Sequence, residues 1–114
     1  MTVREIIQIL HANVITGENN LESEVKSACG SDMMSDVLAF VKNQSVLLTG
    51  LVNPQVVRTA EMMDMKCIVF VRGKSPDGSI VKLADEKGIV LLNTKERMFT
   101  ACGLLYSSGL KGAE

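Results

Sequence analysis

Few of the residue types that carry out catalysis occur at spacings that would let them act together. The three cysteines, Cys29, Cys67 and Cys102, lie far apart, form no C-x-x-C pair and have no histidine at metal-ligand spacing. Cys29 precedes a turn into a predicted helix that could lower its thiol pKa, but it has no basic neighbour, so a structural role is favoured. The one histidine, His11, follows a predicted helix end, and no G-x-S-x-G sequence is present. The sequence therefore predicts no catalytic residue, no metal site and no cofactor, and it indicates that the protein is not an enzyme.

Polar residues that could bind an anion follow two of the predicted strands. Residues 49–53, at the end of the strand predicted over 46–50, contain glycine with a hydroxyl and an amide side chain, and residues 72–75, after the strand predicted over 67–71, contain glycine, two cations and a hydroxyl. Each segment leads into a predicted helix whose free amide groups favour an anion. The candidate ligand-binding residues are Thr49, Gly50, Asn53, Arg72, Gly73, Lys74 and Ser75.

Simpler interpretations of these polar residues stay open. Four side chains stand where helix caps are expected, namely Asp32, Asn53, Ser75 and Thr94. Arg72 and Lys74 could be a solvated pair on a loop. If an anion binds, we expect it near Arg72, Gly73 and Lys74, beside the helix that is predicted to begin at Pro76.

Methionine is more frequent than a chain of this length needs, with seven among 114 residues. Clusters at residues 33–34 and 62–65 cannot place every side chain against a sheet. Core gap-filling is the simpler interpretation, and an adaptable apolar contact surface is the alternative. The candidate interface residues are Met33, Leu51, Val52, Met62 and Met65.

The composition fits one globular domain, with 46% apolar residues, 22% charged residues and a net charge of −1. Without a basic run, binding to nucleic acid or to an acidic membrane surface is not expected. No apolar stretch is long enough to cross a bilayer, so we expect a cytoplasmic protein. Residues 1–110 are predicted to form a single domain and residues 111–114 a frayed tail.

The hydrophobic pattern alternates strands with helices. Strands are expected at residues 14–16, 25–29, 46–50, 67–71 and 89–92, and helices at 2–10, 31–41, 53–63, 75–87 and 94–106. The later strands are continuous apolar runs, which are typical of strands covered on both faces. Because short connections join these units as βαβ crossovers, the predicted fold is a three-layer α/β/α domain with a mainly parallel sheet. The pairing of the N-terminal strands stays open.

The stretch from Val46 to Tyr106 resembles the DRTGG domain family. Gly50 occupies the place of the first glycine of the family motif, Gly73 follows the second strand, and Pro76 matches the expected proline. Residues 87–90 fit the third strand, and residues 99–101 fit the last helix. The motif itself departs in two places, at Leu51-Val52 where relatives have Asp-Arg and at Val71-Arg72 where they have Thr-Gly.

This resemblance implies a fold similar to the N-terminal domain of HPr kinase/phosphorylase, without kinase activity, because no P-loop sequence occurs. Relatives accompany CBS domains in regulated pyrophosphatases, precede some phosphotransacetylases, or stand alone near iron-hydrogenase genes. The resemblance therefore implies a non-catalytic regulatory or protein-interaction module of an anaerobic-metabolism enzyme system, such as a hydrogenase system. We expect a homodimer that docks on a partner enzyme or regulatory protein. The alternative is a sensor that binds a nucleotide or phosphorylated small molecule at the carboxyl edge of the sheet.

Overall fold

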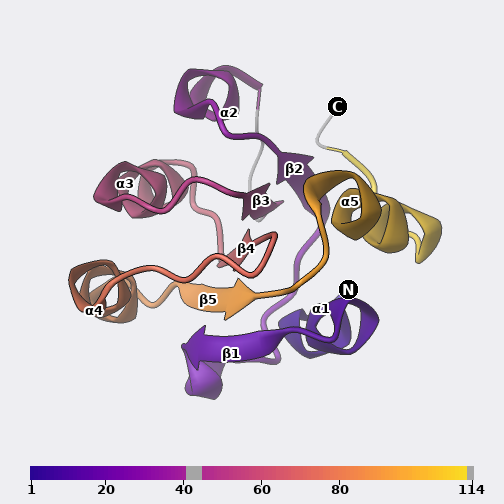
Figure 1. The fold of residues 1–114 in the computed structure, drawn as a ribbon, viewed down its shortest axis with the longest axis horizontal. Helices are drawn as coiled ribbons and strands as arrows, with labels where there is room; N and C mark the ends of the chain where they lie inside the picture. The colour runs from indigo at the N-terminus through magenta and orange to yellow at the C-terminus, as the bar shows by residue number, and fades with distance from the viewer. Residues whose placement is uncertain (41–44, 113–114) are drawn as a thin grey trace.

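The computed structural model of the chain describes residues 1–40 and 45–112, and five strands form one sheet at its centre (Figure 1). The strands are β1 (Asn13–Thr16), β2 (Ser27–Gly30), β3 (Ser45–Thr49), β4 (Cys67–Phe70) and β5 (Val90–Asn93). Their order across the sheet is β1-β5-β4-β3-β2. Strands β2 to β5 pair in parallel, and β1 is antiparallel to β5. The predicted mainly parallel sheet is thus confirmed.

Helices cover both faces of this sheet, as expected of a three-layer α/β/α domain (Figure 1). The helices are α1 (Val3–Leu10), α2 (Met34–Phe40), α3 (Pro54–Met62), α4 (Gly78–Glu86) and α5 (Met98–Ser107), and a short 3-10 helix spans Glu18–Asn20. Helices α2, α3 and α4 lie on one face, and α1 and α5 lie on the other. Apolar residues of the strands alternate between the two faces and form two core clusters.

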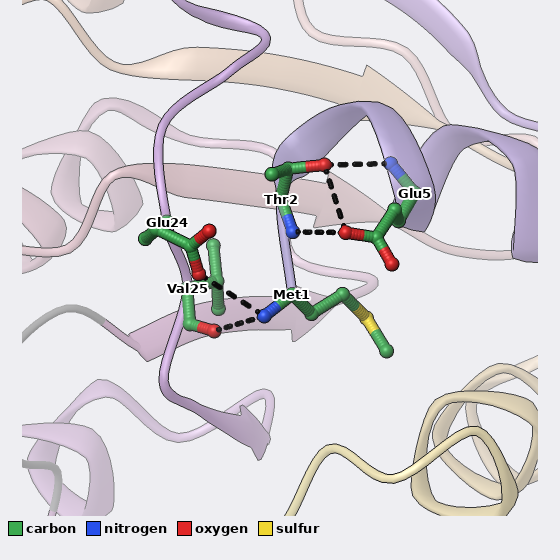
Figure 2. A network of polar contacts seen from close by, with 5 residues as sticks. All are labelled: Met1, Thr2, Glu5, Glu24 and Val25. Carbon is green, nitrogen blue, oxygen red and sulfur yellow. Dashed lines mark hydrogen bonds and ion pairs between the residues drawn. The ribbon is translucent and has the colours of Figure 1, made fainter.

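Polar contacts fix the start of α1 (Figure 2). The hydroxyl of Thr2 accepts a hydrogen bond from the Glu5 amide at 3.2 Å, and the Glu5 carboxylate accepts from the Thr2 amide at 3.1 Å. This is the capping box that the sequence predicts. The amino group of Met1 contacts the Glu24 carboxylate at 3.2 Å and the Val25 carbonyl at 3.4 Å. These contacts join α1 to the segment that enters β2.

The starts of the other helices differ in part from the predicted caps. Asn53 caps α3 as expected, since its side chain accepts from the Val56 amide at 3.3 Å. The cap of α4 is Asp77 rather than Ser75, because the Asp77 carboxylate accepts from two first-turn amides. Thr94 does not cap α5, whose N-cap position is held by Arg97. Val41, expected on the second helix, lies outside the described residues.

The segment after α5 also differs from the expected frayed tail. The Ala28 amide donates to the Lys111 carbonyl at 2.9 Å, and Gly112 forms a parallel bridge with Ala28. The Lys111 ammonium lies 3.9 Å from the centre of the Tyr106 ring. Residues 111 and 112 are therefore bonded to the outer edge of β2. Across residues 1–40 and 45–112, no helix has the length and apolar character needed to cross a membrane.

Candidate anion-binding site

The candidate site lies where two neighbouring parallel strands send their connections to opposite faces of the sheet. The segment after β4 leads to α4 on one face, and the segment after β5 leads to α5 on the other (Figure 1). Such a change of direction opens a crevice at the carboxyl ends of the strands, where α/β domains usually bind their ligands. The two segments are joined at this edge, because the amides of Arg72 and Gly73 donate to the carbonyls of Glu96 and Thr94, both at 2.8 Å.

A cavity of about 710 Å³ occupies this position. Its lining residues are Asp32, Val71, Arg72, Lys95, Arg97, Met98 and Phe99. Three of them are cations and one is a carboxylate, although the whole chain has a net charge of −1. Within residues 1–40 and 45–112, none of the three cations forms an ion pair with a carboxylate. The cavity therefore concentrates positive charge that the fold itself does not neutralise.

Arg72 has an unusual backbone conformation and a close neighbour. Its φ angle of 60° lies in the left-handed region, which a side chain with a Cβ rarely adopts. Its guanidinium lies over Gly50, where an added Cβ would collide with Arg72 Nη2 and would stand 3.2 Å from Cζ. The absence of a side chain at Gly50 thus leaves room for the Arg72 guanidinium in this position.

Asp32 reaches the cavity from the segment after β2. Its Oδ1 accepts hydrogen bonds from the Thr49 hydroxyl at 3.0 Å and from the Gly50 amide at 2.7 Å. The Thr49 hydroxyl in turn accepts from the Leu51 amide at 3.1 Å. Asp32, which the sequence predicts as a cap of α2, thus joins two loops through its Oδ1. Near α2 it is Ser31 that accepts from a backbone amide, that of Met33, at 3.0 Å.

The start of α5 contributes three of the lining residues, Arg97, Met98 and Phe99. No side chain among the described residues caps α5, whereas the side chains of Asn53 and Asp77 accept hydrogen bonds from first-turn amides of α3 and α4. The first-turn amides of α5 are therefore available beside two cations, Arg97 and Lys95. Thr94 instead fixes the loop to α1, because its hydroxyl donates to the Leu10 carbonyl at 2.8 Å.

Sequence reasoning found only part of this site. Of the predicted ligand-binding residues, Arg72 lines the cavity and Gly50 lies next to the Arg72 guanidinium. Lys74 is exposed and does not line the cavity, while the Ser75 hydroxyl accepts from the Asn93 amide group at 2.9 Å. Thr49 and Asn53 are held in the loop and cap contacts described above, and Gly73 bonds to Thr94. Lys95, Arg97 and Phe99 were missed. The sequence pattern that could have indicated the site is the pair of cations, Lys95 and Arg97, in the short segment after β5.

The candidate interface residues divide into three groups. Met33 and Met62 are 61% and 73% exposed, as a contact surface requires. Leu51 and Val52 are half-buried and pack against the core beside α3. Met65 is 2% exposed and belongs to that core, so its assignment to an interface is wrong. The alternative interpretation of methionine as core filler holds at this position.

The cysteines show no sign of reactive or metal-binding chemistry. Burial raises the pKa of the Cys67 thiol far above its usual range, and burial also raises the pKa of the Cys29 and Cys102 thiols. The possibility of a lowered thiol pKa at Cys29 is therefore wrong. No group of histidine, cysteine and carboxylate side chains among the described residues could hold a metal ion.

Comparison with known proteins identifies the family of this chain. The sequence pattern of the DRTGG domain matches residues 5–108. The chain belongs to the DRTGG domain family. A similar solved structure is that of the CBS and DRTGG domains of the regulatory region of Clostridium perfringens pyrophosphatase, complexed with the activator diadenosine tetraphosphate. The TM-score is 0.79 at 17% identity, over 94% of this chain and 46% of that one, so this chain spans about half the length of the relative. No curated protein matches the sequence.

This chain differs from the DRTGG family motif in two loops at the carboxyl edge of the sheet. Leu51-Val52 replaces the polar pair Asp-Arg in the loop after β3. Arg72 stands where the motif has glycine, and this is the position with the left-handed backbone. The chain thus lacks an arginine in one loop at the carboxyl edge and has an arginine in the neighbouring loop, over Gly50.

Proposed function

We propose that this DRTGG domain is a regulatory module that binds a phosphorylated small molecule in the cavity at the ends of β4 and β5. The observation that carries the proposal is the convergence of Arg72, Lys95 and Arg97 on one cavity without carboxylate partners among the described residues. Guanidinium groups bind phosphate oxygens through two parallel hydrogen bonds, and an uncapped helix start adds further donors. An anion with several negative charges suits this arrangement best.

The backbone of Arg72 supports the same proposal. A left-handed conformation costs a residue with a Cβ about 1–2 kcal/mol, and glycine would avoid that cost. Strain of this kind is concentrated at functional sites, where the fold holds a residue in place. The simpler interpretation of Arg72 is a solvated side chain on a loop. That interpretation does not explain why a cation stands at a position whose backbone suits glycine.

The family and the similar structure support the ligand class and the regulatory role. The solved relative is the regulatory region of an enzyme, and its activator carries four phosphates. By analogy, we propose that this chain binds a nucleotide or related phosphorylated molecule and acts on a partner enzyme. A hydrogenase is not part of the proposal, because neither the cavity nor the similar structure points to one.

A ligand panel tests the proposal directly. We expect inorganic tripolyphosphate and ATP to raise the unfolding free energy by about 2.7 kcal/mol at 100 times the dissociation constant, and phosphate and AMP to do so only at higher concentration. Thermal unfolding at constant ionic strength measures this, with sodium chloride as the control for general salt effects. A flat response to all four ligands would contradict the proposal and favour a purely protein-binding module.

We further infer that two copies of the chain form a homodimer that uses the face of α2 and α3. Met33, immediately before α2, and Met62, the last residue of α3, are exposed and favour it, since adaptable apolar side chains suit protein contacts. Light scattering at micromolar concentration is expected to give twice the mass of one chain. Changing both Met33 and Met62 to glutamine should give the single-chain mass, while Tyr106→Ser on the opposite face should not. A wild-type protein with the mass of one chain would rule out the dimer.

A further inference from the structure

We propose that Phe99 makes this cavity selective for nucleotides over other phosphorylated molecules, by stacking on the base while the three cations hold the phosphates. This inference rests on the proposed function, because it names the class of ligand that the same cavity prefers. It assigns a specificity role to one side chain that neither the motif of the family nor the positive charge of the cavity would give it.

The first observation is the exposure of Phe99. Its side chain is 91% exposed, whereas Phe70 in β4 is fully buried in the core. Phe99 is the second residue of α5 and lines the same cavity as Arg97, two positions before it. A free aromatic ring at the wall of a cationic cavity offers a flat apolar surface next to the phosphate-binding groups.

The second observation is the division of the cavity wall into two kinds of surface. Arg72, Lys95 and Arg97 provide charge, while Met98 and Phe99 provide apolar surface. A simple phosphate or polyphosphate would use only the charged part. A nucleotide has both a charged chain and a planar apolar base, so it matches both parts. The volume of about 710 Å³ lies within the usual range for small-molecule sites.

The polar lining residues also indicate how the base is recognised. Apart from the three cations, the only polar side chain among the described lining residues is that of Asp32, whose Oδ1 already accepts from Thr49 and Gly50. Among the described lining residues, none carries a side-chain amide or hydroxyl group. Recognition through stacking tolerates different bases, because each has a flat aromatic face. We therefore expect ATP and GTP to bind with similar affinity, and UTP, with its smaller ring, to bind more weakly.

Calorimetric titration of the full chain, without divalent cations and at constant ionic strength, tests the inference. The probes are ATP, GTP, UTP and inorganic tripolyphosphate, which carries the same phosphate chain without a nucleoside. In the wild type we expect ATP and GTP to bind roughly tenfold more tightly than tripolyphosphate. In Phe99→Ala that ratio should fall to about one while tripolyphosphate affinity is unchanged, because only the stacking contact is lost.

Two matched variants complete the design. Phe99→Tyr keeps the ring and should keep the ratio. Tyr106→Ala removes a 60% exposed aromatic side chain from the same helix, outside the cavity lining, and should also keep it. Equal binding of ATP and tripolyphosphate to the wild type, or an unchanged ratio in Phe99→Ala, would overturn the inference and leave the proposed function intact. No binding of any probe to the wild type would overturn both.

Discussion

Replacing Arg72 with glycine and Arg97 with alanine is expected to weaken the binding of inorganic tripolyphosphate by at least about 100-fold. A hydrogen bond to a charged group contributes about 1.5–3 kcal/mol, so each guanidinium accounts for about a tenfold change or more. Both side chains line the cavity, and neither forms an ion pair within the described part of the chain. Calorimetric titration measures the change, and Arg58→Ala, which removes an exposed cation from α3, is the matched control.

The same double variant should remain as stable as the wild type or become slightly more stable. Glycine at position 72 removes a left-handed strain of about 1–2 kcal/mol, and its greater freedom in the unfolded chain costs about 0.5–1 kcal/mol. Arg97 makes no side-chain cap contact whose loss would shorten α5. Urea unfolding checks this expectation. A variant that binds tripolyphosphate as well as the wild type would show that the anion site lies elsewhere. A variant that loses several kcal/mol would show that Arg72 is primarily structural.

The sheet was predictable from the sequence because its strands carry a strong local signal. The buried runs that became β3, β4 and β5 are bounded by turns and polar residues, and two-sided burial follows from such runs. The direction of β1 was not predictable in the same way. This strand has only four residues, and they are only partly buried. Its antiparallel pairing with β5 joins segments that lie far apart in the sequence. No local pattern encodes that partner.

The binding edge was predictable, but the site on that edge was not. Parallel strands bring all their following loops to one edge, which gave Arg72 its correct neighbourhood. The choice between Lys74 and Lys95 depends on which loops face each other. Which loops face each other is decided by the crossing of α5 to the face opposite α4, and this crossing follows from packing over the whole sheet. The first turn of α4 is filled by the Asp77 carboxylate, so the expected anion position beside that helix is already occupied by a side chain.

The contact between Asp32 and Thr49 was missed because each residue has a sufficient local explanation. A polar residue before a helix is usually a cap, and a threonine at the end of a strand needs no special role. The structure instead joins the two side chains at 3.0 Å across neighbouring loops. This contact holds the loop that contains Gly50, over which Arg72 lies. It therefore links the stability of the fold to the geometry of the cavity.

Thr49→Val is expected to destabilise the protein by about 2–3 kcal/mol, although the two side chains have nearly the same shape. Thr49 is fully buried, and its hydroxyl both donates to Asp32 and accepts from the Leu51 amide. Valine makes neither bond, so a charged acceptor loses a donor and an amide loses its acceptor. The shift in urea midpoint measures the effect. Thr100→Val on the exposed side of α5 is the control and should change stability by less than about 0.5 kcal/mol.

A double-mutant cycle with Asp32→Ala separates the contact from the general cost of changing Thr49. If the hydrogen bond between Asp32 and Thr49 carries the effect, the double variant should lose less stability than the two single variants together, by about 1 kcal/mol or more. Additive losses would show that the bond from the Leu51 amide accounts for the cost. Tripolyphosphate affinity measured on the same proteins then gives the consequence for the site. Because Asp32 and Thr49 hold the loop beneath Arg72, both single variants should weaken binding, whereas the Thr100→Val control should not.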